Sequence, residues 1–163
     1  MQAITSFTGA VALAAGARVE GPNRFVVTRQ IRFGHCDPAA IVFYPQYVVL
    51  FHEVQEDFFQ YGLGIDYHVM IAANCGAPIV RLDAVFHRPS HMGDIVDFVV
   101  SIETLGKSSI STIFECVAAD GLRVKASLKF VMVDHSVRRT LSIPPELRSR
   151  LEHFQHGGGA PSP

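Results

Sequence analysis

Apolar positions recur along this chain at two different periods, and each period predicts one type of element. Between residues 45 and 62 the spacing is three and four, which predicts a helix with one apolar stripe. Pro45 suits the first turn of this helix, where its missing N–H leaves no bond unmade, and Gly62 is placed to end it as the C′ residue. The stripe consists of Tyr47, Leu50, Phe51, Val54, Phe58 and Tyr61.

Elsewhere, apolar residues alternate with polar ones or form short β-branched runs, as is typical of strands. A first strand is predicted from Arg24, with Val27, Ile31 and Phe33 on its buried face. Turn residues separate the later runs, and Asp120-Gly121 is a strong hairpin signal, as Gly106-Lys107 is a weaker one. Four more strands are therefore predicted, over residues 78–87, 94–104, 108–118 and 122–134.

Two shorter helices complete the pattern. One is predicted over residues 66–73, and another follows Pro144-Pro145 with Leu147, Leu151 and Phe154 on its apolar side. The order is strand, long helix, then four antiparallel strands, so the sheet must curl around the helix to bury its stripe. The pattern therefore predicts an α+β domain.

The chain has 163 residues, which suits one domain with a substantial core. We expect this domain to span residues 23–155. Residues 1–22 are expected to form a flexible extension. Residues 156–163, rich in glycine and proline, are expected to form a disordered tail.

The overall charge narrows the set of partners. A hydrophobic fraction of 48% is ordinary for a globular protein, and the formal charge of −1 provides no cationic field for nucleic acid or an anionic membrane. An anionic ligand therefore needs a local cluster of positive groups.

No apolar run is long enough to span a membrane. The run from Ala10 to Ala17 is similar to a signal-peptide cleavage region, but no Lys or Arg precedes it, so export is not favoured.

Cysteines and histidines show no metal-ligand pattern. The three cysteines are widely spaced and form no CxxC pair, which argues against a disulfide framework or a zinc site and fits a cytoplasmic protein. His87 and His91 are four residues apart, but Pro89 between them rules out a helical metal-binding face. Neither a metal nor a cofactor is expected.

Asp37 stands in a loop of small residues, 34–40, just before the long helix. An Asp-Pro pair is a common turn initiator, which is one interpretation of this residue. A carboxylate near a helix N-terminus also has backbone donors beside it, where an acyl oxygen can be polarised. The residues by themselves leave both interpretations open.

The sixteen residues from Arg32 to Tyr47 resemble the signature of 4-hydroxybenzoyl-CoA thioesterases and their acyl-CoA thioesterase relatives. The shared pattern is an Asp-Pro-Ala-Gly-like loop, an apolar pair, then Tyr-Pro and a polar residue followed by Tyr. Ala77-Pro78-Ile79-Val80 and the spacing of the later strands extend the resemblance over residues 24–134. The resemblance implies a hotdog fold, in which a curved antiparallel sheet wraps around one central helix. It also implies an acyl-CoA substrate and a homodimer or homotetramer (a dimer of dimers) with active sites at the subunit interface.

In this family Asp37 corresponds to the catalytic carboxylate, acting as nucleophile or general base, and the backbone N–H of Tyr44 polarises the thioester oxygen. A carboxylate suffices for this chemistry because a thioester is electrophilic and the CoA thiolate leaves readily. Phe43, Tyr47 and Phe51 are expected to line an aromatic acyl pocket. Candidate residues for the CoA phosphates are Lys107, Ser108 and Arg88, although each charge also fits an ordinary solvated surface.

Two positions depart from the family pattern. Ala40 replaces a glycine, so the backbone there must accommodate a Cβ. His52 stands where the 4-hydroxybenzoyl enzyme has a carboxylate that binds the phenol hydroxyl, and an imidazole would bind a ring substituent differently or simply be an exposed helical residue. The predicted function is hydrolysis of an aromatic (benzoyl- or hydroxybenzoyl-type) acyl-CoA. The alternatives are an aliphatic short- or medium-chain acyl-CoA, or a non-catalytic acyl-CoA-binding module.

Overall fold

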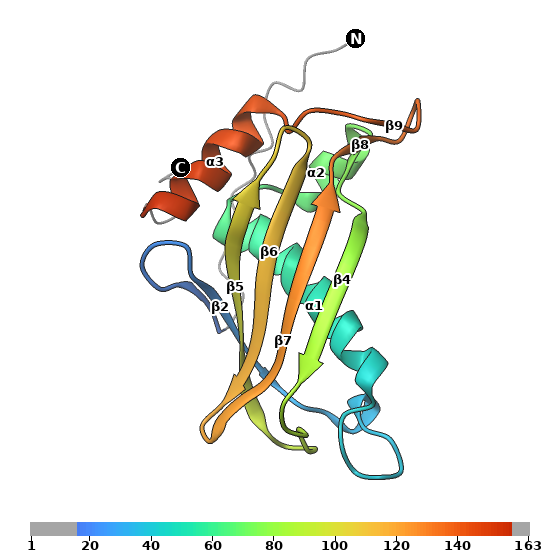
Figure 1. Ribbon diagram of the computed structural model, residues 1–163, viewed down its shortest axis with the longest axis vertical. Coiled ribbons are helices and arrows are strands. Elements are labelled where there is room, and N and C mark those ends of the chain that lie inside the picture. The colour runs from blue at the N-terminus through green and yellow to red at the C-terminus, as the bar shows by residue number, and fades with distance from the viewer. Residues whose placement is uncertain (1–15, 158–163) are drawn as a thin grey trace.

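A six-stranded antiparallel sheet forms the main layer of the computed structural model, which describes residues 16–157 (Figure 1). Its strands lie in the order β1 (Ala17–Val19), β2 (Phe25–Gln30), β5 (Ile95–Leu105), β6 (Ser109–Ala118), β7 (Gly121–Val131) and β4 (Ile79–Phe86). A small second sheet contains β3 (Cys75–Gly76), β8 (Val133–Asp134) and β9 (Arg139–Thr140). β4 is thus an edge strand of the large sheet, paired with β7 along one side.

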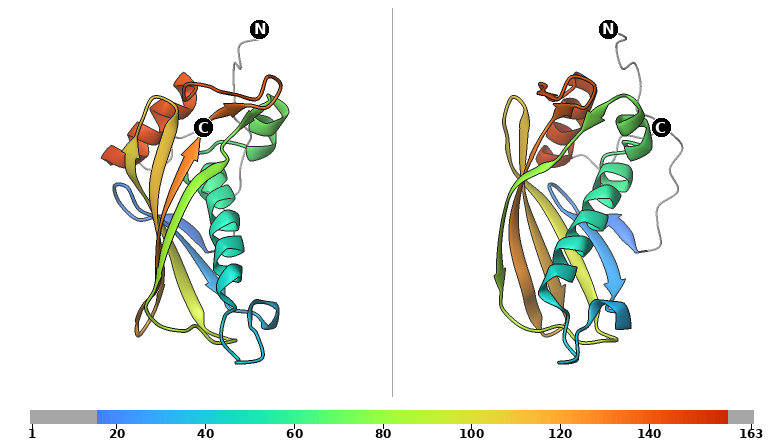
Figure 2. Two further views of the ribbon diagram at one scale, coloured as in Figure 1. Left: turned by 45° about the vertical axis from the view of Figure 1, so that its right-hand side comes forward. Right: turned by 90° about the vertical axis from the view of Figure 1, so that its right-hand side faces the viewer.

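The long helix α1 (Tyr44–Asp57) lies along the concave face of this sheet, which curves around it (Figure 2). Every residue of the predicted stripe from Tyr47 to Phe58 is at most 3% exposed. The ring centroid of Phe51 lies 6.0 Å from that of Phe98 on β5 and 5.5 Å from that of Phe114 on β6. The helix therefore packs on the centre of the sheet. The predicted α+β architecture, a curved sheet around one long helix, is confirmed.

The end of the long helix differs from the prediction. α1 continues into one π-helical turn, η2 (Phe58–Gly62), whose C-cap is Leu63, and the left-handed residue is Gly64 at φ +66°. The prediction of Gly62 as the left-handed C′ residue is therefore wrong. A Cβ on Gly62 would lie 2.7 Å from Phe58 Cδ2 and 3.1 Å from Phe25 Cδ2, so this glycine is required for close packing of two rings.

The first and last predicted strands are each shorter than expected. β2 ends at Gln30, the last residue paired with β5, and the chain then turns into the short 3₁₀ helix η1 (Phe33–His35). Phe33 is 83% exposed, so its predicted burial is wrong: once strand pairing stops, alternation no longer determines which way a side chain points. At the other end, the strand predicted over 122–134 divides at Met132, because β8 pairs with β3 of the second sheet.

The remaining predicted elements are confirmed. Hairpins join β5 to β6 and β6 to β7 at the predicted turns, and Gly121 takes φ +126°. α2 (Tyr67–Ala72) begins at Asp66, whose Oδ1 accepts a hydrogen bond from the backbone N–H of His68 at 2.9 Å. α3 (Pro145–His156) buries Leu147, Leu151 and Phe154. The ring centroid of Phe154 lies 4.9 Å from that of Phe58.

β1 lies within the stretch 1–22 that was expected to be a flexible extension. Its three residues pair with β2, from Ala17 opposite Val27 to Val19 opposite Phe25, so the sheet includes the last part of that stretch. Residues 1–15 and 158–163, which make up the rest of both predicted terminal segments, lie outside the described residues.

Candidate active site

The loop that carries Asp37 is a tight hydrogen-bonded hairpin between η1 and α1. Cys36 and Val42 form an antiparallel bridge across it. Inside that bridge, the backbone N–H of Asp37 donates to Ile41 O at 3.0 Å, and Ala40 N–H donates to Asp37 O at 2.9 Å. The main chain of Asp37 is therefore held on both sides by the opposite limb of its own hairpin.

The carboxylate of Asp37 is half-buried and has one oxygen engaged in this turn. Its Oδ1 accepts a hydrogen bond from the backbone N–H of Ala39 at 2.8 Å. Within residues 16–157, no other hydrogen-bond donor to this carboxylate is found. The two interpretations of Asp37, as a turn residue and as a reactive carboxylate, are thus compatible. The turn uses one carboxylate oxygen and leaves the other available.

Ala40, which stands where the family pattern has glycine, takes a left-handed backbone conformation. Its φ is +63°, in the left-handed region, where a Cβ is unfavourable. The turn accommodates the Cβ at a cost in strain.

Tyr44 is the first residue of α1, and Phe43 is its N-cap. The N–H groups of a first helical turn have no acceptor inside the helix, and no acceptor for the Tyr44 N–H is found elsewhere in the described part of the chain. Such a group, with the helix dipole behind it, is suited to receive a developing negative charge on oxygen.

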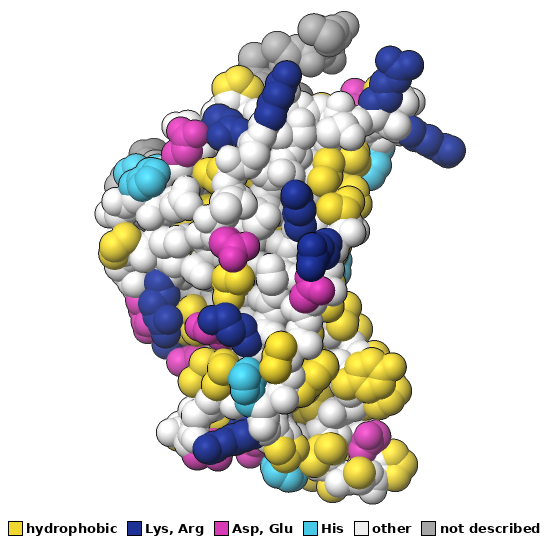
Figure 3. Space-filling model, viewed as in Figure 1, with side chains coloured by type: hydrophobic (Ala, Val, Ile, Leu, Met, Phe, Trp, Pro, Cys, Tyr) yellow, Lys and Arg dark blue, Asp and Glu magenta, His cyan; other side chains and the backbone are white. Residues whose placement is uncertain are grey.

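Exposed aromatic rings surround this helix N-terminus. Phe43 is 45% exposed and Tyr44 is 65% exposed, and their ring centroids lie 5.4 Å apart. The ring centroid of Phe86, at the end of β4, lies 6.5 Å from that of Tyr44. Figure 3 shows apolar side chains gathered over the N-terminal part of α1 and the end of β4. Sequence reasoning missed Phe86, which only the position of β4 beside α1 brings to this surface.

Two of the three rings expected to line an acyl pocket lie in the core instead. Tyr47 is 3% exposed and Phe51 is 1% exposed. The hydroxyl of Tyr47 donates to Ser90 Oγ at 2.8 Å, a residue that sequence reasoning also missed. Of that predicted set, only Phe43 presents its ring at the surface of the protomer.

His52 lies on the outer face of α1, away from the Asp37 hairpin. It is eight residues beyond Tyr44, or about 12 Å along the helix axis. Its side chain is 54% exposed, and its Nε2 lies 3.1 Å from Glu56 Oε1 one turn later. Within one chain, His52 and Asp37 therefore do not converge.

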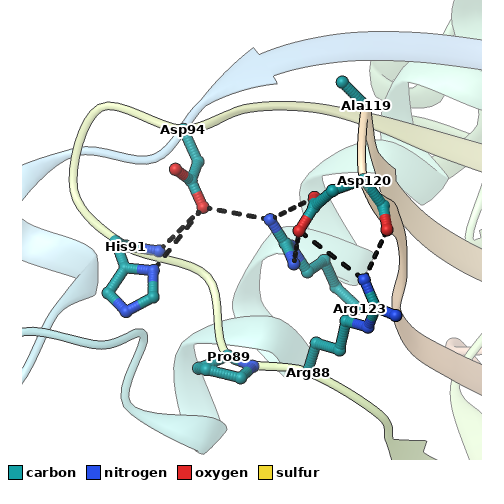
Figure 4. A pocket seen from close by; sticks show the side chains of 7 residues that line it. All are labelled: Arg88, Pro89, His91, Asp94, Ala119, Asp120 and Arg123. Atoms are coloured by element: carbon teal, nitrogen blue, oxygen red, sulfur yellow. Dashed lines mark hydrogen bonds and ion pairs between the residues drawn. The ribbon is translucent and has the colours of Figure 1, made fainter.

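Arg88 follows β4 and lines an open pocket of about 600 Å³ (Figure 4). The guanidinium of Arg88 donates to the backbone carbonyl of Asp120. The buried Arg123 pairs with Asp120 at 2.8 Å and with Asp94 at 3.5 Å. Two arginines face two carboxylates here, so the pocket carries little net charge from these groups. Its walls are formed by Arg88, Pro89, His91, Asp94, Ala119, Asp120 and Arg123.

Lys107 and Ser108 are in the hairpin between β5 and β6, at the end of the sheet opposite the Asp37 loop (Figure 1). β5 has eleven residues, so this hairpin lies roughly 35 Å from the start of that strand. The structure therefore does not bring Lys107 and Ser108 to Asp37 within one chain.

The two buried cysteines are poorly suited to nucleophilic chemistry. Burial raises the pKa of Cys75 to about 11 and that of Cys116 to about 12, so both thiols stay protonated at neutral pH. Within residues 16–157 no group of three His, Cys, Asp or Glu side chains is placed to hold a metal ion. No helix in this part of the chain is long and apolar enough to cross a membrane.

Residues 31–151 of this chain match the Thioesterase-like superfamily. The matched region is most of the chain, and it includes the Asp37 hairpin, α1 and the strands from β4 to β7. The chain belongs to the Thioesterase-like superfamily. The match is to this superfamily as a whole rather than to its 4-hydroxybenzoyl-CoA branch.

Several relatives of this thioesterase are named as hydrolases or thioesterases of CoA esters. It is 27% identical to the 1,4-dihydroxy-2-naphthoyl-CoA hydrolase of Acaryochloris marina over 131 residues, which cover 78% of this chain and 95% of that one. Among solved structures, a gentisyl-coenzyme A thioesterase superposes with a TM-score of 0.72 at 26% identity, covering 77% of this chain and 98% of that one. A 1,4-dihydroxy-2-naphthoyl-CoA thioesterase from Synechocystis shares the fold, with a TM-score of 0.74 at 20% identity over 82% of this chain and 98% of that one.

These relationships confirm the hotdog fold and the prediction that this thioesterase is an enzyme, a hydrolase of acyl-CoA thioesters. The thioesterase places Asp37 at the turn of this hairpin and the Tyr44 N–H directly after its second limb.

Proposed function

We propose that the enzyme hydrolyses an aromatic acyl-CoA to the free acid and CoA, with Asp37 as the reacting carboxylate. One observation carries this proposal. The half-buried Asp37 carboxylate lies at the turn of the hydrogen-bonded hairpin that leads into α1. The Tyr44 N–H, for which no acceptor is found in residues 16–157, lies at the start of that helix. A carboxylate that attacks or takes a proton, together with an oxyanion donor, is sufficient for hydrolysis of a thioester.

In the proposed reaction, the thioester oxygen accepts a hydrogen bond from the Tyr44 N–H. The second oxygen of Asp37 then attacks the carbonyl carbon, the C–S bond breaks, CoA leaves as the thiolate, and water hydrolyses the resulting mixed anhydride. Acting instead as a general base, Asp37 takes a proton from a water molecule that attacks the same carbon. Both routes consume one water and release the acid and CoA, and both use the same carboxylate position.

Two observations support an aromatic acyl group. The relatives named above act on 1,4-dihydroxy-2-naphthoyl-CoA and on gentisyl-CoA, which are both aromatic thioesters. In this chain, the exposed rings of Phe43, Tyr44 and Phe86 form an apolar surface beside the Tyr44 N–H. Aromatic rings pack favourably against such a surface in edge-to-face or offset arrangements.

We also propose that the working enzyme is a homodimer joined along β4. Within residues 16–157, one side of this strand has no partner strand, and the strand's Val80 and Val85 are each 59% exposed. An exposed apolar edge strand pairs readily with another strand. A second copy related by a two-fold axis supplies the same strand in antiparallel orientation.

The charges on β4 favour one register of this pairing. Arg81 and Asp83 are two residues apart, so both side chains stand on the same face of the strand and form an ion pair there. Antiparallel pairing centred on Leu82 places Arg81 of each copy opposite Asp83 of the other. Pairing centred on Asp83 or on Arg81 would instead bring two like charges together, which is destabilising.

This arrangement gives the distant residues a role. A two-fold axis at β4 turns the second copy end for end. The β5–β6 hairpin of one copy, with Lys107 and Ser108, then lies at the same end of the joined sheet as the Asp37 loop of the other. We propose that each CoA contacts Asp37 from one chain and Lys107 and Ser108 from the other, together with Arg88.

The deciding experiment is thiol release from a panel of aryl and alkyl CoA esters by the wild-type protein and Asp37→Asn. We expect kcat to fall at least about a hundredfold in the variant, because the amide neither attacks nor accepts the proton. Asp66→Asn is a matched control, because asparagine also caps a helix and the residue lies outside the site.

Near-normal turnover by folded Asp37→Asn would remove Asp37 from the mechanism. Higher kcat/KM for alkyl than for aryl esters in the wild type would contradict the aromatic specificity while leaving the hydrolase intact.

A further inference from the structure

Tyr47 and Ser90 form a hydrogen bond inside the core, between α1 and the segment that follows β4. The phenol donates to Ser90 Oγ at 2.8 Å, and the two residues are 3% and 0% exposed. Burial raises the pKa of Tyr47 above its ordinary value, so the phenol keeps its proton at neutral pH and remains a donor. A polar pair at this depth is costly to break, since each hydroxyl would be left without water.

The backbone of Ser90 supports the Asp37 hairpin directly. Val42 N–H donates to Ser90 O at 2.9 Å, and Ile41 forms an antiparallel bridge with His91. Ile41 O in turn accepts the hydrogen bond from Asp37 N–H. One unbroken sequence of bonds therefore runs from the Tyr47 side chain through Ser90 and the second limb of the hairpin to the main chain of Asp37.

The same helix carries the proposed oxyanion donor. Tyr47 is three residues after Tyr44, one turn along α1, so its ring and the Tyr44 N–H belong to one rigid element. The far end of the segment is held separately, because Asp94 pairs with Arg123 and its carbonyl accepts from Ile31 N–H at 2.8 Å. The hairpin runs directly into α1, and the Tyr47–Ser90 bond adds a second tie, through the segment after β4.

We infer that Tyr47 and Ser90 are positioning residues, which hold the Asp37 carboxylate at a fixed place relative to the Tyr44 N–H. This role rests on the proposed function of Asp37. It replaces the direct substrate contact that was expected of Tyr47, whose ring and hydroxyl are both occupied inside the protein. Small displacements of reacting groups lower kcat strongly, whereas binding of the rest of the substrate is little affected.

The test separates positioning from stability with two variants. Tyr47→Phe removes the donor but leaves the Ser90 hydroxyl buried and unpaired, so this variant is expected to lose both stability and kcat. Tyr47→Phe/Ser90→Ala removes both hydroxyls, so no buried polar group is left unpaired and the melting temperature should recover most of that loss. Tyr61→Phe, in the turn η2 that continues the same helix, makes the same chemical change away from the hairpin and serves as the control.

We expect kcat of the double variant to stay about tenfold to a hundredfold below wild type, with KM within about twofold. Recovery of kcat together with stability would overturn the inference, because the bond would then act through folding alone.

Amide hydrogen exchange tests the same inference without any substrate. In the double variant, the Val42 and Asp37 amides should exchange at least about tenfold faster than in wild type, while amides in β6 keep their protection. Unchanged protection of both amides would overturn the inference whatever the enzyme turns over. Absence of thiol release by the wild type would instead contradict the proposed function, so the two failures are distinguishable.

Discussion

At the scale of single residues, the turn beside Asp37 holds a non-glycine residue in a conformation that favours glycine. Ala40 at φ +63° carries a left-handed strain of about 1–2 kcal/mol. Glycine would relieve it but would cost about 0.4–1 kcal/mol through greater freedom of the unfolded chain. We therefore expect Ala40→Gly to stabilise the protein by roughly 0.5–1 kcal/mol, measured as a higher urea midpoint with an unchanged slope.

The neighbouring Ala39 provides the control for this prediction, because its φ is not positive. Ala39→Gly gains no relief of strain and should lower the urea midpoint. Equal shifts in the two variants would mean that strain at Ala40 has no part in the effect.

His52 presents the second residue-scale question, since its imidazole stands where the 4-hydroxybenzoyl enzyme has a carboxylate. If it binds a substituent on the acyl ring, His52→Ala should change the ratio of kcat/KM between hydroxylated and unsubstituted benzoyl-CoA by about tenfold. The measurement is the ratio, not the absolute rate. His68→Ala, an exposed histidine on α2, is the control. An equal loss of rate for every ester would show that His52 acts through packing or assembly.

At the scale of elements, the site depends on a short hairpin placed between a helix N-terminus and an edge of the sheet. The pattern of the sequence predicts the helix and the loop, because both follow from local spacing of side chains. It does not predict that the segment after β4 returns to pair with Ile41 and Val42, since that contact depends on where β4 lies. Ser90 and Phe86 reach the site by this route, and no local signal marks either of them.

The register proposed for β4 can be tested by exchanging charges between copies. Arg81→Asp makes this strand edge wholly acidic and Asp83→Arg makes it wholly basic, so each variant alone should dimerise at least about tenfold more weakly. An equimolar mixture should recover wild-type dimerisation in sedimentation velocity. Both variants lack the ion pair within the chain, so recovery must come from pairing between chains. A mixture that stays as weak as its components would exclude pairing centred on Leu82.

At the scale of the whole molecule, the two ends of the sheet carry different parts of the predicted site. Asp37, Tyr44 and Arg88 lie at one end, and Lys107 and Ser108 at the other. The sequence assigned all five residues to one site, because it carries no information on which chain of an assembly contributes each residue. In the proposed dimer, a second copy turned end for end would place all five at one site.

The sequence by itself determined the architecture and singled out Asp37 as the carboxylate proposed to react. Periods of two and of three to four predict strands and helices directly, because burial of one face requires them. The motif from Arg32 to Tyr47 singles out Asp37 without any coordinates. The tertiary structure alone decided that Phe33 is exposed, that Tyr47 is buried against Ser90, and that Lys107 lies far from Asp37. These outcomes depend on strand register and on the curl of the sheet. Both bring together residues that are distant along the chain, and local spacing does not encode them.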